Sequence, residues 1–136
     1  MSIEFKGLDD VLAMLDKPVE PEKLERALMR ACLVVERAAK QKAPKGTGEL
    51  QRSITSKVED GQGIVYTPLE YAPYVEYGTG LFAEEGGRKD VPWCYQDDEG
   101  NWHSTSGMRP RPFMRPALDE NREDILRVLR EGLLDD

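Results

Sequence analysis

One amphipathic stretch, residues 21–42, constrains the fold more than any other part of the sequence. Its apolar side chains recur at helical spacing, and the stripe consists of Leu24, Ala27, Leu28, Ala31, Val34, Val35 and Ala38. Pro21 suits the first turn, because its fixed φ is helical and no N–H is needed there. Twenty-two residues span about 33 Å as a helix. The chain is therefore expected to fold around one long helix, and the alanines favour close approach by a sheet or a second helix.

Strand and turn signals follow this helix. A loop is predicted over residues 43–48, which contain one proline and two glycines. The segments 53–58 and 63–67 are rich in β-branched residues and flank Asp60-Gly61, a turn dipeptide. This pattern predicts an antiparallel hairpin.

Two more helices are expected. Residues 7–17 show helical spacing of leucine and valine and precede Pro18, which stops a helix. A last helix is predicted from Pro116 to Leu133, with its inward side chains at Leu118, Ile125, Leu126, Leu129 and Leu133. The fold class is therefore α+β, with the long helix and the C-terminal helix packed on a small antiparallel β-sheet.

Residues 81–107 lack a clear hydrophobic period and contain many glycines and acids. They are predicted to form a loop or hairpin within a single domain spanning residues 1–136. The segments 91–95 and 101–105 are the expected strands of that second hairpin, and Asp97–Gly100 is the expected turn.

The charged side chains are segregated along the chain, whose net charge is −7. Residues 20–57 carry a net charge of +4 and residues 108–116 carry +3, whereas residues 58–107 carry −8. Such blocks favour complementary contacts between copies of the chain or with another protein. They disfavour duplex nucleic acid as the main ligand, because that requires a continuous basic face.

Cofactor chemistry is not expected. The glycine-containing segments 44–48 and 78–80 lack complete phosphate-binding patterns. Cys94 and His103, with Asp97 or Asp98, are a weak metal-binding candidate, because zinc sites usually show two paired sets of ligands. Cys32 lies within the long helix and is predicted to be a core residue. The sequence has no other cysteine or histidine, so no catalytic residue, metal or cofactor is predicted.

The apolar runs are too short for a membrane span, and the N-terminal residues show no secretory signal. We therefore expect a cytosolic, reducing environment and no membrane contact.

Two segments have more than one interpretation. Glu76 lies in an aromatic-rich segment and is either a general acid or base with a raised pKa or a structural carboxylate. The structural interpretation is preferred, with Arg109, Arg111, Arg115 or the turn amides of residues 78–80 as partners. Residues 109–116 are either a proline-rich recognition peptide or, as preferred, a stiff connector that places Phe113 in the core.

The ordered motifs resemble those of a known family. They are Val35–Lys40 in the long helix, Ala43-Pro44 with Thr47–Leu50, Arg52–Ile54, Tyr71–Thr79 and Arg111–Leu118. Together they resemble the small head–tail morphogenesis proteins of long-tailed phages, also called tail-completion, neck or minor tail proteins. Twelve residues match the family motifs, and we expect them to define the fold or to form contacts between subunits. They are Tyr71, Ala72, Tyr74, Val75, Glu76, Gly78, Thr79, Arg111, Pro112, Phe113, Arg115 and Pro116.

The resemblance implies a non-enzymatic virion protein at the head–tail junction, with residues 81–107 as the variable loop or hairpin of the family. It implies a homo-hexameric ring around the DNA channel, between a head connector or stopper protein and the tail tube or tail terminator protein, with DNA passing through without sequence-specific binding. The acidic residues of 58–107 or of the C-terminal tail are then expected to face the channel. The alternatives are a monomeric phage-encoded binding or regulatory module and, from another class, a small enzyme that uses Glu76.

Overall fold

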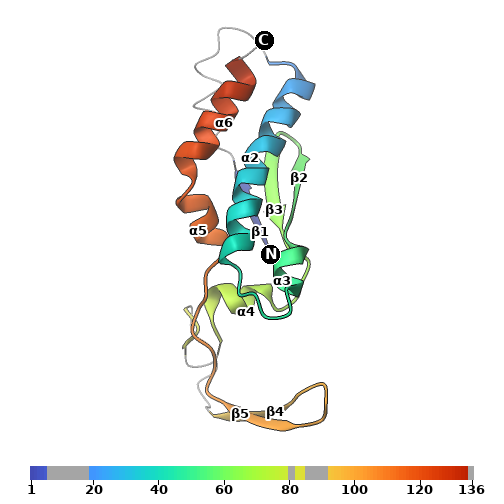
Figure 1. Ribbon diagram of the computed structural model, residues 1–136, viewed down its shortest axis with the longest axis vertical. Coiled ribbons are helices and arrows are strands. Elements are labelled where there is room, and N and C mark those ends of the chain that lie inside the picture. Colours follow the sequence, from blue (N-terminus) through green and yellow to red (C-terminus); the bar gives the residue numbers. More distant parts are fainter. Residues whose placement is uncertain (6–18, 80–81, 85–91, 135–136) are drawn as a thin grey trace. The chain divides into compact units, whose positions relative to one another are not determined.

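A computed structural model shows two compact units (Figure 1). The core unit is formed by Met1–Leu69 and Phe113–Asp136, and the insert unit by Glu70–Pro112. The residues that the structure describes are 1–5, 19–79, 82–84 and 92–134. The helix expected at residues 7–17 lies outside them. The single domain expected over residues 1–136 stays a prediction.

The long helix α2 spans Pro21–Lys42, as predicted, with Pro21 in its first turn and Lys42 in its last. Within the core unit it packs against both the sheet and the C-terminal helices (Figure 1). Its buried residues are Ala27, Leu28, Ala31, Cys32, Val35 and Ala39. The burial of Cys32 confirms its assignment to the core. Leu24, Val34 and Ala38, which belong to the predicted stripe, are only half-buried.

The sheet of the core unit has three antiparallel strands in the order β1-β3-β2. Strand β2 spans Thr55–Glu59 and β3 spans Gln62–Tyr66. Glu59 pairs with Gln62, so Asp60-Gly61 is a two-residue turn, and both turn residues have positive φ, 52° and 73°. This is the conformation that Asp-Gly favours in hairpins, and the predicted hairpin is confirmed.

Strand β1 (Ser2–Phe5) and helix α3 (Glu49–Ser53) were not expected from the sequence. β1 is four residues long and pairs with β3, so its alternation is too short to stand out from a random pattern. α3 is a single turn after Gly48, whose φ of 83° is left-handed. Both elements exist because tertiary contacts supply the stability that such short segments lack alone.

The prediction of one C-terminal helix from Pro116 to Leu133 is wrong in detail, because two helices are present. Helix α5 spans Met114–Asp119 and α6 spans Arg122–Leu134. The earlier start places Pro116 in the first turn of α5, where its missing N–H costs nothing. The break follows from Asn121, whose side-chain amide donates to the Ala117 carbonyl at 2.8 Å. In a continuous helix the backbone N–H of residue 121 would make that bond.

The break also changes which side chains face inward. Ile125, Leu129 and Leu133 are buried, as predicted, and Phe113 before α5 is fully buried. Leu126 was expected to face inward but is 38% exposed. The sequence pattern also fits Leu126, because it precedes Leu129 by three residues and Leu133 by seven, spacings that belong to one helical face.

Helices α2 and α6 approach closely at one glycine. A Cβ atom added at Gly132 would lie 3.0 Å from Cβ of Ala27. The small side chain at Ala27 and the absence of one at Gly132 therefore set how near the helices pack. This contact explains part of the alanine content noted in the sequence.

The insert unit contains helix α4 (Ala72–Tyr77) and a two-stranded sheet of β4 (Trp93–Gln96) and β5 (Trp102–Thr105). The strands pair antiparallel, with Trp93 opposite Thr105 and Gln96 opposite Trp102. The second predicted hairpin is therefore confirmed. With the long helix, the C-terminal helices and antiparallel sheets in place, the α+β fold class is confirmed as well.

We predict that Gly132→Leu destabilises the core unit by roughly 1–3 kcal/mol, because the larger side chain forces α6 away from α2. Chemical denaturation monitored by circular dichroism measures this change. Glu131→Leu is the matched control, since residue 131 is exposed on the same helix and should shift stability by less than about 0.5 kcal/mol. Equal effects of the two substitutions would contradict the close packing at Gly132.

Candidate functional site

Backbone hydrogen bonds tie residues 75–79 of the insert unit to residues 108–111. The backbone N–H of Arg111 donates to the Val75 carbonyl at 2.8 Å, and the N–H of Thr79 donates to the Met108 carbonyl at 2.9 Å. The N–H of Met108 donates in return to Oγ1 of Thr79 at 2.8 Å. Residues 75–79 and 108–111, which are far apart in the sequence, therefore lie side by side.

Gly78 makes this pairing possible. Its φ of 83° and ψ of 174° belong to a region that only glycine occupies without strain. A Cβ atom there would lie 2.9 Å from both the Met108 carbonyl oxygen and Cδ of Pro110. The glycine thus ends α4 and lets residues 108–110 approach. Arg109, in that segment, places its guanidinium 4.6 Å from the centre of the Phe82 ring.

Helix α4 separates buried from exposed motif residues. Ala72 and Glu76, one turn apart, are fully buried, whereas Tyr71, Tyr74 and Tyr77 are 39%, 59% and 38% exposed. Every buried side-chain nitrogen or oxygen among the described residues has a hydrogen-bond partner. Glu76 is therefore a buried carboxylate with its hydrogen bonds made, which favours the structural interpretation over a general acid or base.

The remaining motif residues fall in both units. Arg111 and Pro112 are exposed in the insert unit, while Phe113 is buried in the core unit. Arg115 and Pro116 lie in the first turn of α5 and are half-buried. The structure thus brings Val75, Thr79 and Arg111 together. The interface role of the whole set stays a prediction.

The hairpin β4–β5 does not bring the candidate metal ligands together. Cys94 pairs with Ser104 and Tyr95 with His103, so Cys94 and His103 point to opposite faces of the ribbon. Nε2 of His103 lies 2.7 Å from Oδ2 of Asp97, and this hydrogen bond holds the pKa of Asp97 below its usual value. Within the described ranges no group of three or more potential metal ligands occurs.

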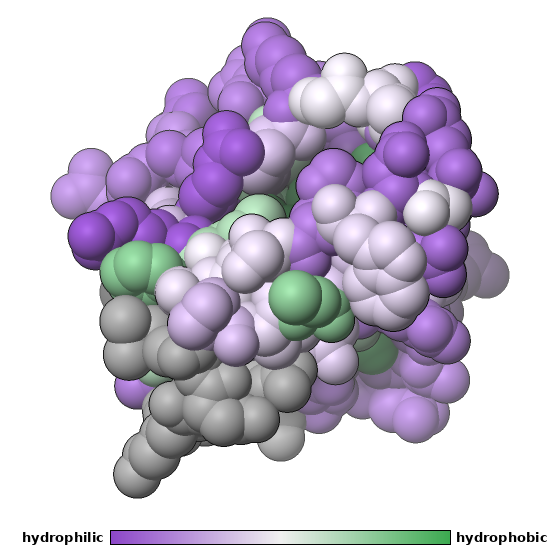
Figure 2. All heavy atoms as spheres, turned by 90° about the horizontal axis from the view of Figure 1, so that it is seen from below, coloured by the Kyte–Doolittle hydropathy of each residue, from purple (hydrophilic) through white to green (hydrophobic). Residues whose placement is uncertain are grey.

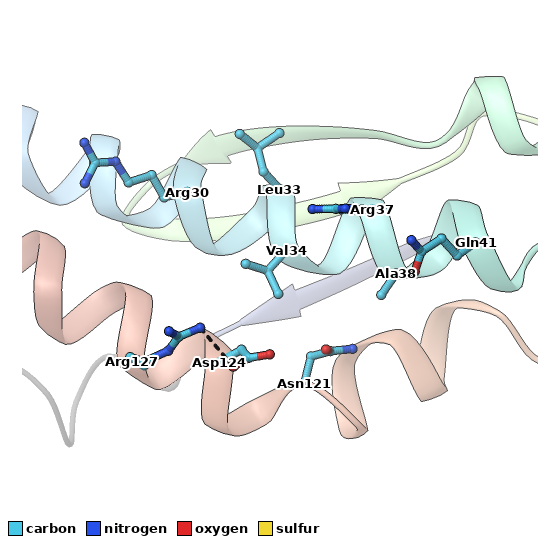
Figure 3. A pocket seen from close by; sticks show the side chains of 9 residues that line it. All are labelled: Arg30, Leu33, Val34, Arg37, Ala38, Gln41, Asn121, Asp124 and Arg127. Carbon is cyan, nitrogen blue, oxygen red and sulfur yellow. Dashed lines mark hydrogen bonds and ion pairs between the residues drawn. The ribbon is translucent and has the colours of Figure 1, made fainter.

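A groove between α2 and α6 was missed by the sequence analysis (Figure 3). Its volume is about 510 Å³, and its lining residues are Arg30, Leu33, Val34, Arg37, Ala38, Gln41, Asn121, Asp124 and Arg127. Three arginines and one aspartate make it basic, and Arg127 pairs with Asp124 at 3.1 Å. Val34 and Ala38 project from α2 toward α6 (Figure 3). One sequence signal could have revealed it: Leu33 is apolar, lies off the buried stripe and is flanked by Arg30 and Arg37.

No helix in the described part of the chain is both long and apolar enough to cross a membrane.

The face drawn in Figure 2 is mostly hydrophilic, with separate hydrophobic spots. A small α+β protein with a basic groove, exposed tyrosines and an exposed hairpin has the surfaces of a protein that contacts other chains.

The comparison with protein families agrees with this class. A family model described as "Bacteriophage HK97-gp10, putative tail-component" matches residues 8–78, just over half of the chain. The chain therefore belongs to the HK97-gp10-like family of phage tail components, which confirms the predicted resemblance. The matched range includes α2, the β2–β3 hairpin and α4 and ends before the β4–β5 hairpin. Comparisons with curated proteins and with solved structures found no match. Membership in a tail-component family indicates a structural role.

We predict that Gly78→Ala disrupts the insert unit, because it adds backbone strain of about 1–3 kcal/mol to an overlap with Met108 and Pro110. Hydrogen exchange should show faster exchange of the amides of Thr79 and Arg111. Gly61→Ala is the control, since Gly61 also has positive φ but has nothing within 4 Å of the added Cβ. Unchanged protection at Thr79 and Arg111 in Gly78→Ala would contradict the proposed role of the glycine.

We predict that Cys32 makes stability fall at high pH. Burial raises the pKa of the Cys32 thiol from 9.0 to about 11, so between these values the unfolded chain loses a proton that the folded chain keeps. The associated stability is present below pH 9 and is lost as the pH rises to 11, by roughly 2–3 kcal/mol.

Denaturation at pH 8 and pH 11 measures this loss. Cys32→Ala should lose less stability than the parent chain over this interval. Cys94→Ser should lose as much as the parent, because Cys94 is exposed. Parallel losses in all three proteins would show that Cys32 does not titrate differently in the folded state.

Proposed function

We propose that this tail component completes the tail at the head–tail junction and forms a ring around the DNA channel there. The observation that carries the proposal is the family match over residues 8–78. The separation of charge supports a ring, because subunits that carry unlike surfaces associate head to tail, and such contacts close when the rotation permits.

The proposed neighbours are the head connector or stopper protein on one side and the tail tube or tail terminator protein on the other. Six copies are expected, to match the six-fold symmetry that the family resemblance implies for the tail tube. The protein then resides in the virion at the head–tail junction and in the host cytoplasm before assembly.

Acidic side chains are the proposed lining of the channel, since like charge lets DNA slide without sticking. Glu59, Asp60 and Glu70 are exposed acids in the 58–107 block that could face the channel. A basic lumen in the assembled ring would contradict this part of the proposal.

We predict that virions contain the protein and that removing its gene leaves filled heads and free tails that do not join. Quantitative mass spectrometry of purified particles should give about six copies per virion, and electron cryomicroscopy should place a ring at the head–tail junction. Complementation with the intact gene is the control. Absence of the protein from both virions and tail precursors would refute the proposal and would favour a monomeric regulatory module.

A further inference from the structure

The β4–β5 hairpin is exposed on both faces. Cys94, Tyr95, Gln96, Trp102, His103 and Ser104 are all exposed, although a two-stranded ribbon alone is marginally stable in water. Trp102 is 69% exposed, the largest value for a large hydrophobic side chain in the described part of the chain. Tryptophan is among the residues that most often dominate protein interfaces, so the hairpin has the features of a docking element.

The two faces of the hairpin differ. On one face the rings of Tyr95 and His103 stack with their centres 5.2 Å apart, and His103 also bonds Asp97. Trp102 lies on the other face with Cys94 and Gln96, because neighbouring positions alternate along a strand. The side chains of the first face contact one another. The Trp102 face is therefore the one available to a partner.

The groove of the core unit is complementary to this element. Leu33 is 50% exposed beside it, and Arg30 and Arg37 form no salt bridge with any described residue. The hairpin turn carries Asp98 and Glu99, both exposed. The groove is open to solvent and its volume of about 510 Å³ leaves room for a tryptophan side chain.

We propose that the β4–β5 hairpin of one copy docks in the α2–α6 groove of the next copy. Trp102 then covers Leu33 and Val34, and the acidic turn lies beside Arg30 and Arg37. An arginine over the indole ring adds a cation–π contact. The inference rests on the proposed ring and names the contact that builds it.

A second copy fits this groove better than DNA does. The groove contains Asp124 as well as arginines, whereas a DNA footprint requires a continuous basic face. Its exposed apolar residue, Leu33, has no role in binding a phosphate backbone. The two complementary surfaces lie on the same chain and are unlike each other, so the contact is heterologous and can propagate around a ring.

Cross-linking in assembled virions tests the contact. Leu33→Cys places a thiol in the groove, and the natural thiol of Cys94 lies on the Trp102 face of the hairpin. Mild oxidation of virions carrying Leu33→Cys should give a ladder of covalent species from dimer to hexamer. Leu126→Cys is the matched control, because Leu126, on α6, is also an exposed leucine but lies outside the groove; it should give no ladder. Leu33→Cys with Cys94→Ser should also lose the ladder.

The outcomes separate this inference from the proposed function. If imaging shows the ring but Leu33→Cys gives only monomers, isolated dimers or monomers with an internal 33–94 disulfide, the docking contact is refuted while the proposed function stands. If the protein is absent from the particle, the proposed function fails, and the docking inference fails with it.

Charge reversal tests the electrostatic half of the contact. Arg30→Glu with Arg37→Glu should reduce the cross-linked fraction of the Leu33→Cys protein at least tenfold. Adding Asp98→Lys and Glu99→Lys should restore most of it, because the charges are complementary again. A cross-linked fraction that does not respond to the first pair, or does not recover with the second, would refute the pairing of the turn with the two arginines.

Discussion

The core unit depends on the burial of α2 from two directions. On the sheet side, Glu36 accepts a hydrogen bond from Ser56 Oγ at 2.9 Å, and Cys32 contacts the Lys57 carbonyl with its sulfur. On the helix side, Ala27 meets Gly132 of α6 at close range. Small residues are needed where the helices approach, and polar residues are tolerated where the helix meets the sheet edge. The remaining surface of α2, with Arg30, Leu33 and Arg37, is left for contacts outside the fold.

The sequence predicts the elements that have strong local signals. α2 was predicted to its exact bounds because a proline, a stripe and terminal lysines agree, and the β2–β3 hairpin was predicted because Asp60-Gly61 favours one turn type. The break between α5 and α6 could not be predicted, because it depends on one side-chain bond from Asn121. The hydrogen bond between Val75 and Arg111 could not be predicted either, because backbone hydrogen bonds between distant segments leave no periodic pattern in the sequence. The groove forms only where α2 and α6 pack together, so the sequence of either helix alone does not predict it. The exposed apolar residue Leu33 is the one sequence feature that points to it.

The insert unit uses backbone hydrogen bonds where the core unit uses apolar packing. The bonds of Thr79 and Arg111 to Met108 and Val75 depend little on side-chain identity, with Gly78 as the main exception. These backbone hydrogen bonds can support a hairpin whose amino-acid sequence varies. This agrees with the resemblance, in which the family varies over residues 81–107, and with a family match that ends at residue 78. The hairpin, which we propose as the docking element, can therefore diverge in sequence without loss of the fold.

Charge and hydrophobic contact have different consequences for assembly. Exposed ion pairs contribute about 0–1 kcal/mol each, so Arg30 and Arg37 alone cannot hold a ring together. They affect mainly the rate and specificity of association, which matters for a chain whose net charge is −7 and whose copies repel at a distance. In the ring that we propose, the contact of Trp102 with Leu33 would supply affinity, because a central aromatic residue that excludes water dominates most interfaces. A ring that requires both this contact and the charge pairing would close on the correct neighbour rather than on any acidic or apolar surface.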